Sequence, residues 1–217
     1  MVGARLRTGR RNQGLTLRQL ASKVGVSPQL LSQIENGKTL PSVATLKAVV
    51  TELGLTFDDV FVAMSSGSTD SSSPSATRRP AVSRKTDDSA GPVFRAGSYP
   101  VLQMTGGVTL SQLPTGVIGA AVESFVTTLP PGTASSTDGS LVRHNGAELC
   151  FVYEGTLMLK LGFETYDLNV GDVAAFDSTV PHVYVNNGEE PAKAMWMQTQ
   201  ALGYEQMVVD EQGEAAE

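Results

Sequence analysis

A run of seven serines in eleven positions, from Ser65 to Ser75, divides the 217-residue chain into two parts of different character. Such a stretch has almost nothing to bury and cannot offset the entropy of ordering, so it predicts a flexible linker over residues 65–79. A random coil of that length spans about 20 Å, which connects two domains without fixing their orientation. We therefore expect one domain over residues 1–64, a second over 80–211 and a disordered tail over 212–217.

The two parts also differ in charge. Residues 1–64 carry eight Lys and Arg against four Asp and Glu, whereas residues 80–217 carry six against seventeen. A basic first part and an acidic second part indicate that only the first part meets a polyanion such as nucleic acid. No apolar run reaches the roughly 18 residues of a membrane span, and the N-terminus lacks the apolar segment of a signal peptide. We therefore expect a cytoplasmic protein without a membrane partner.

The first part has the start and stop signals of short helices. Thr16 and Gln19 form a capping box, and Gly25 supplies a helix end. Ser27 and Pro28 then provide an N-cap and a first helical position where the missing N–H costs nothing. With apolar residues recurring at helical spacing, the pattern predicts an all-α bundle. The five predicted helices cover residues 3–13, 17–24, 28–35, 42–53 and 55–64.

The second and third predicted helices, joined by Val24 to Ser27, have the arrangement of a helix-turn-helix. The third helix exposes polar side chains, and glutamine pairs with the edge of adenine in the major groove. Basic and polar residues on both sides of this helix are placed for backbone phosphates. The predicted DNA contacts are Arg10, Arg11, Thr16, Arg18, Ser27, Pro28, Gln29, Ser32, Gln33, Asn36, Lys38 and Thr39.

The segment from Leu15 to Leu46, with Ser-Pro at 27–28 and Asn-Gly-Lys at 36–38, resembles the XRE (lambda-repressor-like) helix-turn-helix family. The resemblance covers nearly all of residues 3–61. It implies a five-helix bundle whose third helix, about 28–35, enters the major groove of double-stranded DNA. The alternative is a helical module that binds a protein, but the exposed helix is polar and does not form an apolar binding face.

From Pro80 onward, short runs rich in Val, Thr, Phe and Tyr alternate with Gly, Pro, Asn and Asp. This spacing of short strands predicts an all-β sandwich or barrel. The clearest predicted strands are residues 117–128, 148–153, 156–161, 172–176, 182–186 and 193–199.

Both histidines of the chain lie in clusters of potential metal ligands. His144 stands four residues before Glu148, and His182 opens a strand that continues to Asn186. If the barrel brings these faces together, two imidazoles and one carboxylate converge, a set that holds Fe, Mn, Ni or Zn with open positions. The alternative is a metal-free barrel in which His144 and His182 are hydrogen-bonded core residues.

These clusters resemble the two motifs of the cupin family, with the resemblance extending over about residues 80–205. The matching residues are His144, Glu148, Gly155, Gly171, His182 and Asn186. Val142 fills the family's first histidine position, and Asp177 and Thr179 replace the middle Pro and Gly of the second motif. The resemblance implies a double-stranded β-helix (jelly-roll) barrel with three of its usual four metal ligands.

The same barrel offers candidate ligand-binding residues, which are Cys150, Tyr184, Asn186 and Trp196. Aromatic residues in strands also serve as plain core or as a dimer interface. Cys150, as the single cysteine, cannot form an intrachain disulfide. We expect it to be a buried, unreactive thiol rather than a redox sensor, because no neighbouring base would lower its pKa.

We therefore expect a homodimeric, DNA-binding transcriptional regulator, and not an enzyme. Its cupin domain would dimerise the chain, sense a small-molecule effector and lie apart from the DNA-binding domain. The effector would then act by altering contacts between the domains or the dimer geometry. One alternative is a metal-dependent oxygenase or isomerase with an accessory DNA-binding domain, for which Tyr184 and Glu123 are weak acid–base candidates. Another is an adaptor whose barrel only dimerises.

Overall fold

The structure is a computed structural model that describes residues 2–57, 59–61, 93–95, 97–114 and 122–199. The predicted linker (65–79) and tail (212–217) lie outside these residues. Among the described residues, no helix has both the length and the apolar character that a membrane crossing requires.

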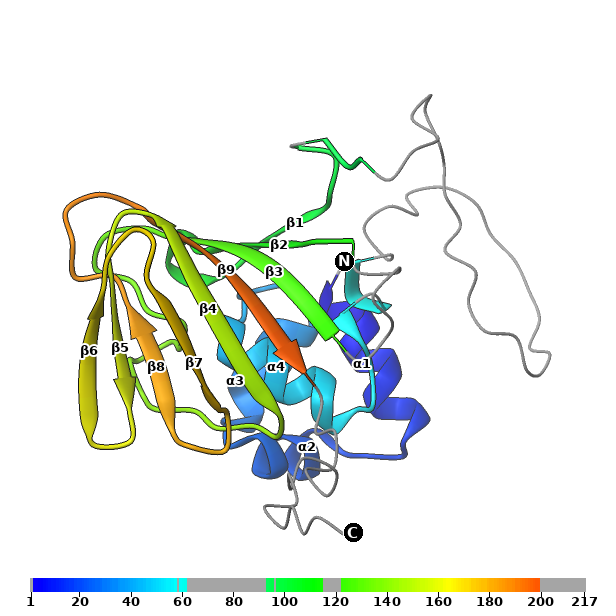
Figure 1. Cartoon of the computed structure of the whole chain (residues 1–217). Coiled ribbons are helices and arrows are strands. Elements are labelled where there is room, and N and C mark those ends of the chain that lie inside the picture. The colour runs from blue at the N-terminus through cyan, green and yellow to red at the C-terminus, as the bar shows by residue number, and fades with distance from the viewer. Residues whose placement is uncertain (1, 58, 62–92, 96, 115–121, 200–217) are drawn as a thin grey trace, which may run out of the picture.

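The first part of the chain forms a bundle of short helices (Figure 1). The capping box at Thr16 is present, and Gly25 ends the second helix in the left-handed region, with φ of 71°. Ser27 accepts a hydrogen bond from the N–H of Leu30, and Ser42 accepts one from the N–H of Thr45. The predicted turn chemistry of the helix-turn-helix is therefore confirmed. The helices are α1 (Val2–Asn12), α2 (Leu17–Val24), α3 (Pro28–Glu35) and α4 (Val43–Glu52).

A further helical segment follows α4, over residues 57–61 apart from residue 58. Thr56 caps it reciprocally with Asp59, because the Asp59 N–H donates to Thr56 Oγ1 and the Thr56 N–H donates to the Asp59 carboxylate. This segment completes the predicted set of about five helices. The rest of the predicted range, 62–64, lies outside the described residues.

The second part is an antiparallel β structure made of two sheets. The larger sheet has the strand order β1-β2-β3-β9-β4-β7, and the smaller has the order β6-β5-β8. The loop between β3 and β4 adds isolated bridges, Ala134 to Val185 and Val142 to His182, which tie it to β8 of the smaller sheet. The strands are β1 (Val101–Gln103), β2 (Thr109–Gln112), β3 (Val122–Leu129), β4 (Ala147–Glu154), β5 (Leu157–Leu161), β6 (Glu164–Leu168), β7 (Val173–Asp177), β8 (His182–Val185) and β9 (Ala192–Thr199), with a 3₁₀ turn at Thr105–Gly107.

Most predicted strands are present within one or two residues of their expected ends, but β1, β2 and β6 were not predicted. β6 is exposed at four of its five positions, so it has no alternating apolar pattern that sequence could reveal. β1 has three residues, too few for any periodic signal. The first part of the predicted strand 117–128 falls largely outside the described residues.

The two parts of the chain contact each other directly, so the expectation of a barrel lying apart from the DNA-binding domain is wrong. The N–H of Ala44 in α4 donates to the carbonyl of Ser135 at 3.1 Å. The ring of Phe57 packs edge-on against Phe125 of β3, with the centroids 4.7 Å apart. Both phenylalanines are buried, and burying them accounts for an interface that linker composition could not reveal.

Candidate functional site

The polar side of α3 is open to solvent. Gln29 is exposed, and Ser32 and Gln33 are half-buried along the same helix. Of the other predicted DNA contacts, Thr39 is half-buried, and the exposed ones are Arg11, Thr16, Arg18, Ser27, Pro28, Asn36 and Lys38. The surface around α3 therefore combines amide, hydroxyl and cationic groups, the set that reads base edges and contacts phosphates.

Arg10 is the exception among the predicted contacts. It is buried, its guanidinium donates twice to the Glu35 carboxylate, and its Nη1 donates to the carbonyl of Leu15. A guanidinium bound in this way holds α1 against the end of α3 and is not presented to a phosphate. We therefore remove Arg10 from the DNA contacts.

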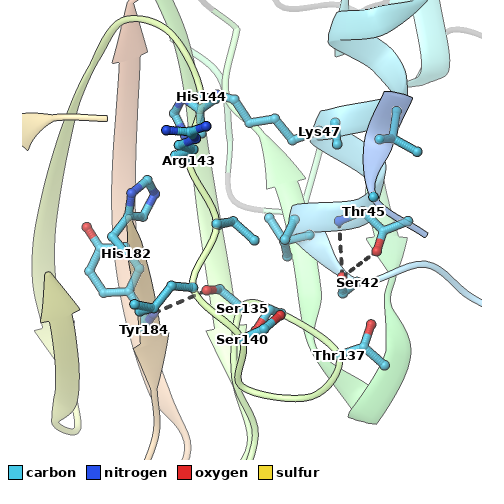
Figure 2. A pocket seen from close by; sticks show the side chains of 18 of the residues that line it. Ser42, Thr45, Lys47, Ser135, Thr137, Ser140, Arg143, His144, His182 and Tyr184 are labelled. Atoms are coloured by element: carbon cyan, nitrogen blue, oxygen red, sulfur yellow. Dashed lines mark hydrogen bonds between the residues drawn. The ribbon is translucent and has the colours of Figure 1, made fainter. Parts of the chain in front are cut away.

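The cluster expected in the barrel is present. One ligand atom from each of His144, Glu148 and His182 lies within 4.8 Å of the others. The Nε2 of His144 is 3.3 Å from Glu148 Oε2, and the Nε2 of His182 is 3.9 Å from the same oxygen. The Glu148 carboxylate stands on β4, the His182 imidazole on β8 and the His144 imidazole on the loop before β4, so three separate segments supply the set. Figure 2 shows the two imidazoles.

The surroundings of the cluster orient its donors as metal sites do. The Nδ1 of His182 lies 2.9 Å from the carbonyl of Val180, which holds the proton on that nitrogen and leaves Nε2 with its lone pair facing Glu148. The side-chain amide of Gln198 on β9 donates to Glu148 Oε2 at 2.6 Å. The residues present therefore fit a divalent cation: two imidazoles and one carboxylate are a set for Fe, Mn, Ni or Zn.

Protonation at the cluster also favours ligand forms. Burial lowers the pKa of His182, although Glu148 and Val180 oppose the shift, so the imidazole is neutral at neutral pH. Burial by itself raises the pKa of Glu148, but the hydrogen bond with His144, the positive charge that His182 carries when protonated in acid, and the charge of Lys47 outweigh it and bring that pKa below its ordinary value. A neutral imidazole beside an ionised carboxylate is what a metal ion requires.

A cavity of about 640 Å³ adjoins the cluster, and the four predicted ligand-binding residues divide around it. Tyr184 and Trp196 line the cavity, whereas Cys150 is fully buried and is not among the lining residues. The amide of Asn186 is occupied by the carbonyls of Leu129 and Glu190 and by the N–H of Gly188. Asn186 therefore shapes the loop before β9, and neither it nor Cys150 lines the cavity.

The cavity has lining residues that sequence reasoning missed, Lys47, Ser136, Arg143 and Gln198. Gln198 faces Glu148 because the two are directly paired between β9 and β4, a register that the sequence does not specify. Lys47 comes from the helical part of the chain, and only the contact between the two parts brings it to the barrel. No local pattern around either residue marks it as functional.

Comparison with known proteins divides the chain in the same way. A family model described as helix-turn-helix matches residues 6–60, and one described as cupin domain matches residues 125–198.

Individual relatives extend this picture. The HTH-type transcriptional regulator PuuR of Escherichia coli (strain K12) is 28% identical over 184 residues, covering 85% of this chain and 86% of that protein. The HTH-type transcriptional regulator DdrOP3 of Deinococcus deserti is 38% identical over 56 residues, covering 26% of this chain and 43% of that protein. A solved structure, an HTH_3 family transcriptional regulator from Vibrio cholerae, superposes with a TM-score of 0.60 at 20% identity and covers 92% of this chain and 95% of its own.

Proposed function

The chain is an XRE-type helix-turn-helix protein with a C-terminal cupin domain, and from this premise we propose that it is a transcriptional regulator whose cupin domain senses a small molecule. The observation that carries the proposal is the capped, solvent-exposed α3, with the amides of Gln29 and Gln33 on its polar side. A likeness to PuuR that spans both domains supports the regulator as a whole.

The DNA-binding part is tested by selecting bound sequences from a random double-stranded library with the full chain. We expect an enriched palindrome with half-sites about 34 Å apart, since one short helix makes too few base contacts and a pair of chains is needed. Enrichment of no sequence above the library background contradicts the proposal. The selected palindrome is called the operator below.

We propose further that His144, Glu148 and His182 hold a divalent metal of the Fe, Mn, Ni or Zn group. Such a metal would supply open coordination positions to an effector, while the protein fixes the three donors through Val180 and Gln198. Elemental analysis of the full chain after metal loading tests this. The wild type should retain one metal per chain, and the double variant His182→Ala with Glu148→Ala should retain none. A wild type that takes up no metal in titration overturns the assignment.

We also propose that the chain works as a homodimer in the cytoplasm, because a palindromic site requires two readers and DNA is the partner. Sedimentation of the full chain measures its mass in solution and should give twice the chain mass of 22.8 kDa. If the chain is strictly monomeric in solution but still selects a palindrome, the two chains would associate only when they bind DNA.

The competing proposal is a metal-dependent enzyme. The two acid–base candidates do not support it: burial and Glu148 raise the pKa of Tyr184 well above its ordinary value, and the Glu123 carboxylate accepts a hydrogen bond from the backbone of Phe57 at the domain contact. We therefore propose a sensor that binds its effector without consuming it. Steady consumption of oxygen by the metal-loaded chain would favour the enzyme instead.

A further inference from the structure

The cavity beside the His144, Glu148 and His182 cluster has walls from both domains. Its barrel side includes the cluster itself, and its helical side includes the start of α4, with Thr45 and Lys47 (Figure 2). The turn between α2 and α3 at residues 24–26 also lines it. A volume of about 640 Å³ is in the range of small-molecule sites, roughly 300 to 1,000 Å³. A ligand of that size would touch the DNA-binding domain and the barrel at once.

Two buried polar atoms in the cavity wall, Ser136 Oγ and Gln198 Oε1, have no hydrogen-bond partner among the described residues. A buried donor or acceptor left unpaired costs on the order of 1–3 kcal/mol, so two of them in one wall indicate that a polar guest completes the site. Gln198 uses its amide nitrogen on Glu148, which leaves its oxygen facing the guest.

Lys47 extends from α4 toward the loop that carries Arg143 and His144 (Figure 2). No carboxylate of the described chain lies within 4 Å of its ammonium, although Glu148 and Glu123 act on it from farther away. Burial lowers the pKa of Lys47 to about 8, so the side chain is still mostly protonated at neutral pH. A partly buried cation without a close anion is a place where an anionic group of a ligand gains most.

We propose that this cavity binds a small organic acid whose carboxylate pairs with the Lys47 ammonium and whose apolar part packs against Leu110, Phe125 and Trp196. The inference rests on the proposed function, because it assigns the chemical class of the effector. Of the cations that line the cavity, Lys23 is paired with Glu52 and Arg143 is exposed, which leaves the half-buried Lys47 ammonium as the main partner for an anion. A single such donor matches a carboxylate better than a phosphate, which needs several donors around it. Amine ligands would meet Lys47 and Arg143 as like charges, and the one buried carboxylate in the wall, Glu148, is already held by His144 and Gln198.

This arrangement also couples the ligand to DNA binding. Lys47 is part of α4, while the turn at residues 24–26 leads directly into α3, and both border the cavity. An acid held by Lys47 and by the barrel wall therefore adds a bond across the contact between the domains. Binding of the acid then favours the conformation in which α4 contacts the barrel. If the operator affinity differs between this conformation and one in which the two domains are apart, the acid changes the operator affinity.

The test compares three probes of nearly the same shape with the full chain: benzoate, its neutral counterpart benzamide and its cationic counterpart benzylamine. Calorimetry should show benzoate binding at millimolar concentration or better, at least about tenfold more tightly than benzamide. The Lys47→Met variant should lose about tenfold in benzoate affinity, and Lys47→Arg should keep most of it. Lys160→Met, which removes an exposed lysine of β5 outside the cavity, is the matched control and should bind benzoate like the wild type.

Equal binding of benzoate and benzamide, tighter binding of benzylamine, or no benzoate binding overturns the proposal. So does a folded Lys47→Met that binds benzoate normally. If Lys47→Met does not fold, the comparison of benzoate with benzamide on the wild type decides alone. A wild type that selects an operator but does not prefer benzoate contradicts the organic acid as ligand and leaves the proposed regulator standing. A wild type that prefers benzoate but selects no DNA sequence contradicts the proposed regulator and leaves the acid site standing.

Discussion

Arg10 holds Glu35 by two hydrogen bonds from one guanidinium, Nε to Oε1 at 2.6 Å and Nη2 to Oε2 at 2.8 Å. The pair joins α1 to the last residue of α3, and Arg7 stands 3.5 Å from the same carboxylate. Both partners are buried, which places a two-point ionic contact directly behind α3, the helix that we propose contacts DNA. The basic residues of the first domain therefore have two roles, one internal and one at the surface.

Arg10→Met should destabilise the helical domain by about 3 kcal/mol, because it leaves the Glu35 carboxylate buried without its main partner. Chemical denaturation followed by helical circular dichroism measures the change. Lys23→Met is the control, since it breaks an ion pair with Glu52 whose side chains are 53% and 30% exposed, and it should cost about 1 kcal/mol at most. A loss for Arg10→Met no larger than that of the control would mean that the buried pair contributes little.

Gln29→Ala should weaken operator binding by about 1–3 kcal/mol and leave binding to random DNA nearly unchanged, because an amide that pairs with a base edge discriminates between sequences. Fluorescence anisotropy with both DNAs at one salt concentration measures the two effects. Ser22→Ala changes an exposed residue of α2 outside the predicted contacts and should alter neither affinity. Equal losses on both DNAs would assign Gln29 to the phosphate backbone instead of the bases.

Gly155→Ala should be far more damaging than Gly132→Ala, although the two glycines have nearly the same φ, 70° and 71°. An added methyl group at Gly155 would lie 2.7 Å from the carbonyl oxygen of Pro191, whereas at Gly132 it would meet nothing within 4 Å. We expect about 1 kcal/mol for Gly132→Ala from backbone strain alone, and about 1–3 kcal/mol more for Gly155→Ala. Thermal or chemical unfolding of the two variants side by side provides the measurement, and similar losses would refute the close approach.

Cys150 should resist alkylation by iodoacetamide at pH 8 in the folded chain and react readily once urea unfolds it. The side chain is fully buried, and burial, followed by the nearby Glu148 charge, raises its pKa to about 12, so almost no thiolate exists at that pH. Mass spectrometry of the alkylated chain counts the adduct. Equal rates in the two states would reopen a redox role for this thiol.

Local sequence signals predicted the helical domain well because α2, α3 and α4 each carry a side-chain N-cap. Thr16, Ser27 and Ser42 bond to the first turns that follow them, and such short-range chemistry is visible in a single sequence. The three residues of the metal cluster were also predicted, since their residue types and spacing match a known motif. Arg10 shows the limit of this approach, because a basic residue beside a DNA-reading helix looks the same whether it contacts phosphate or a buried carboxylate.

The residues that sequence did not predict depend on contacts between distant segments. Gln198 reaches Glu148 through strand register, and Lys47 reaches the barrel through the contact between domains. The spacing of apolar residues does not mark either position. Lys47, for example, directly follows the buried Leu46 in α4 and has no local feature that distinguishes it from other polar helix residues. Asn186 was misplaced for the same reason: its partners Leu129 and Glu190 are set by how the loop before β9 folds back.

The hydrogen bond from Ala44 to Ser135 limits how this protein is re-engineered. A chimera that joins another cupin domain to this DNA-binding domain would keep α4 and Phe57. It would replace their partners in the barrel, Ser135 and Phe125. The chimera would lose the native contacts between the two domains, and under the proposed coupling a new effector specificity would not reach DNA binding. Transferring residues 42–61 together with the barrel preserves both sides of the contact between the domains. The segment to exchange in such a regulator therefore begins within its DNA-binding domain.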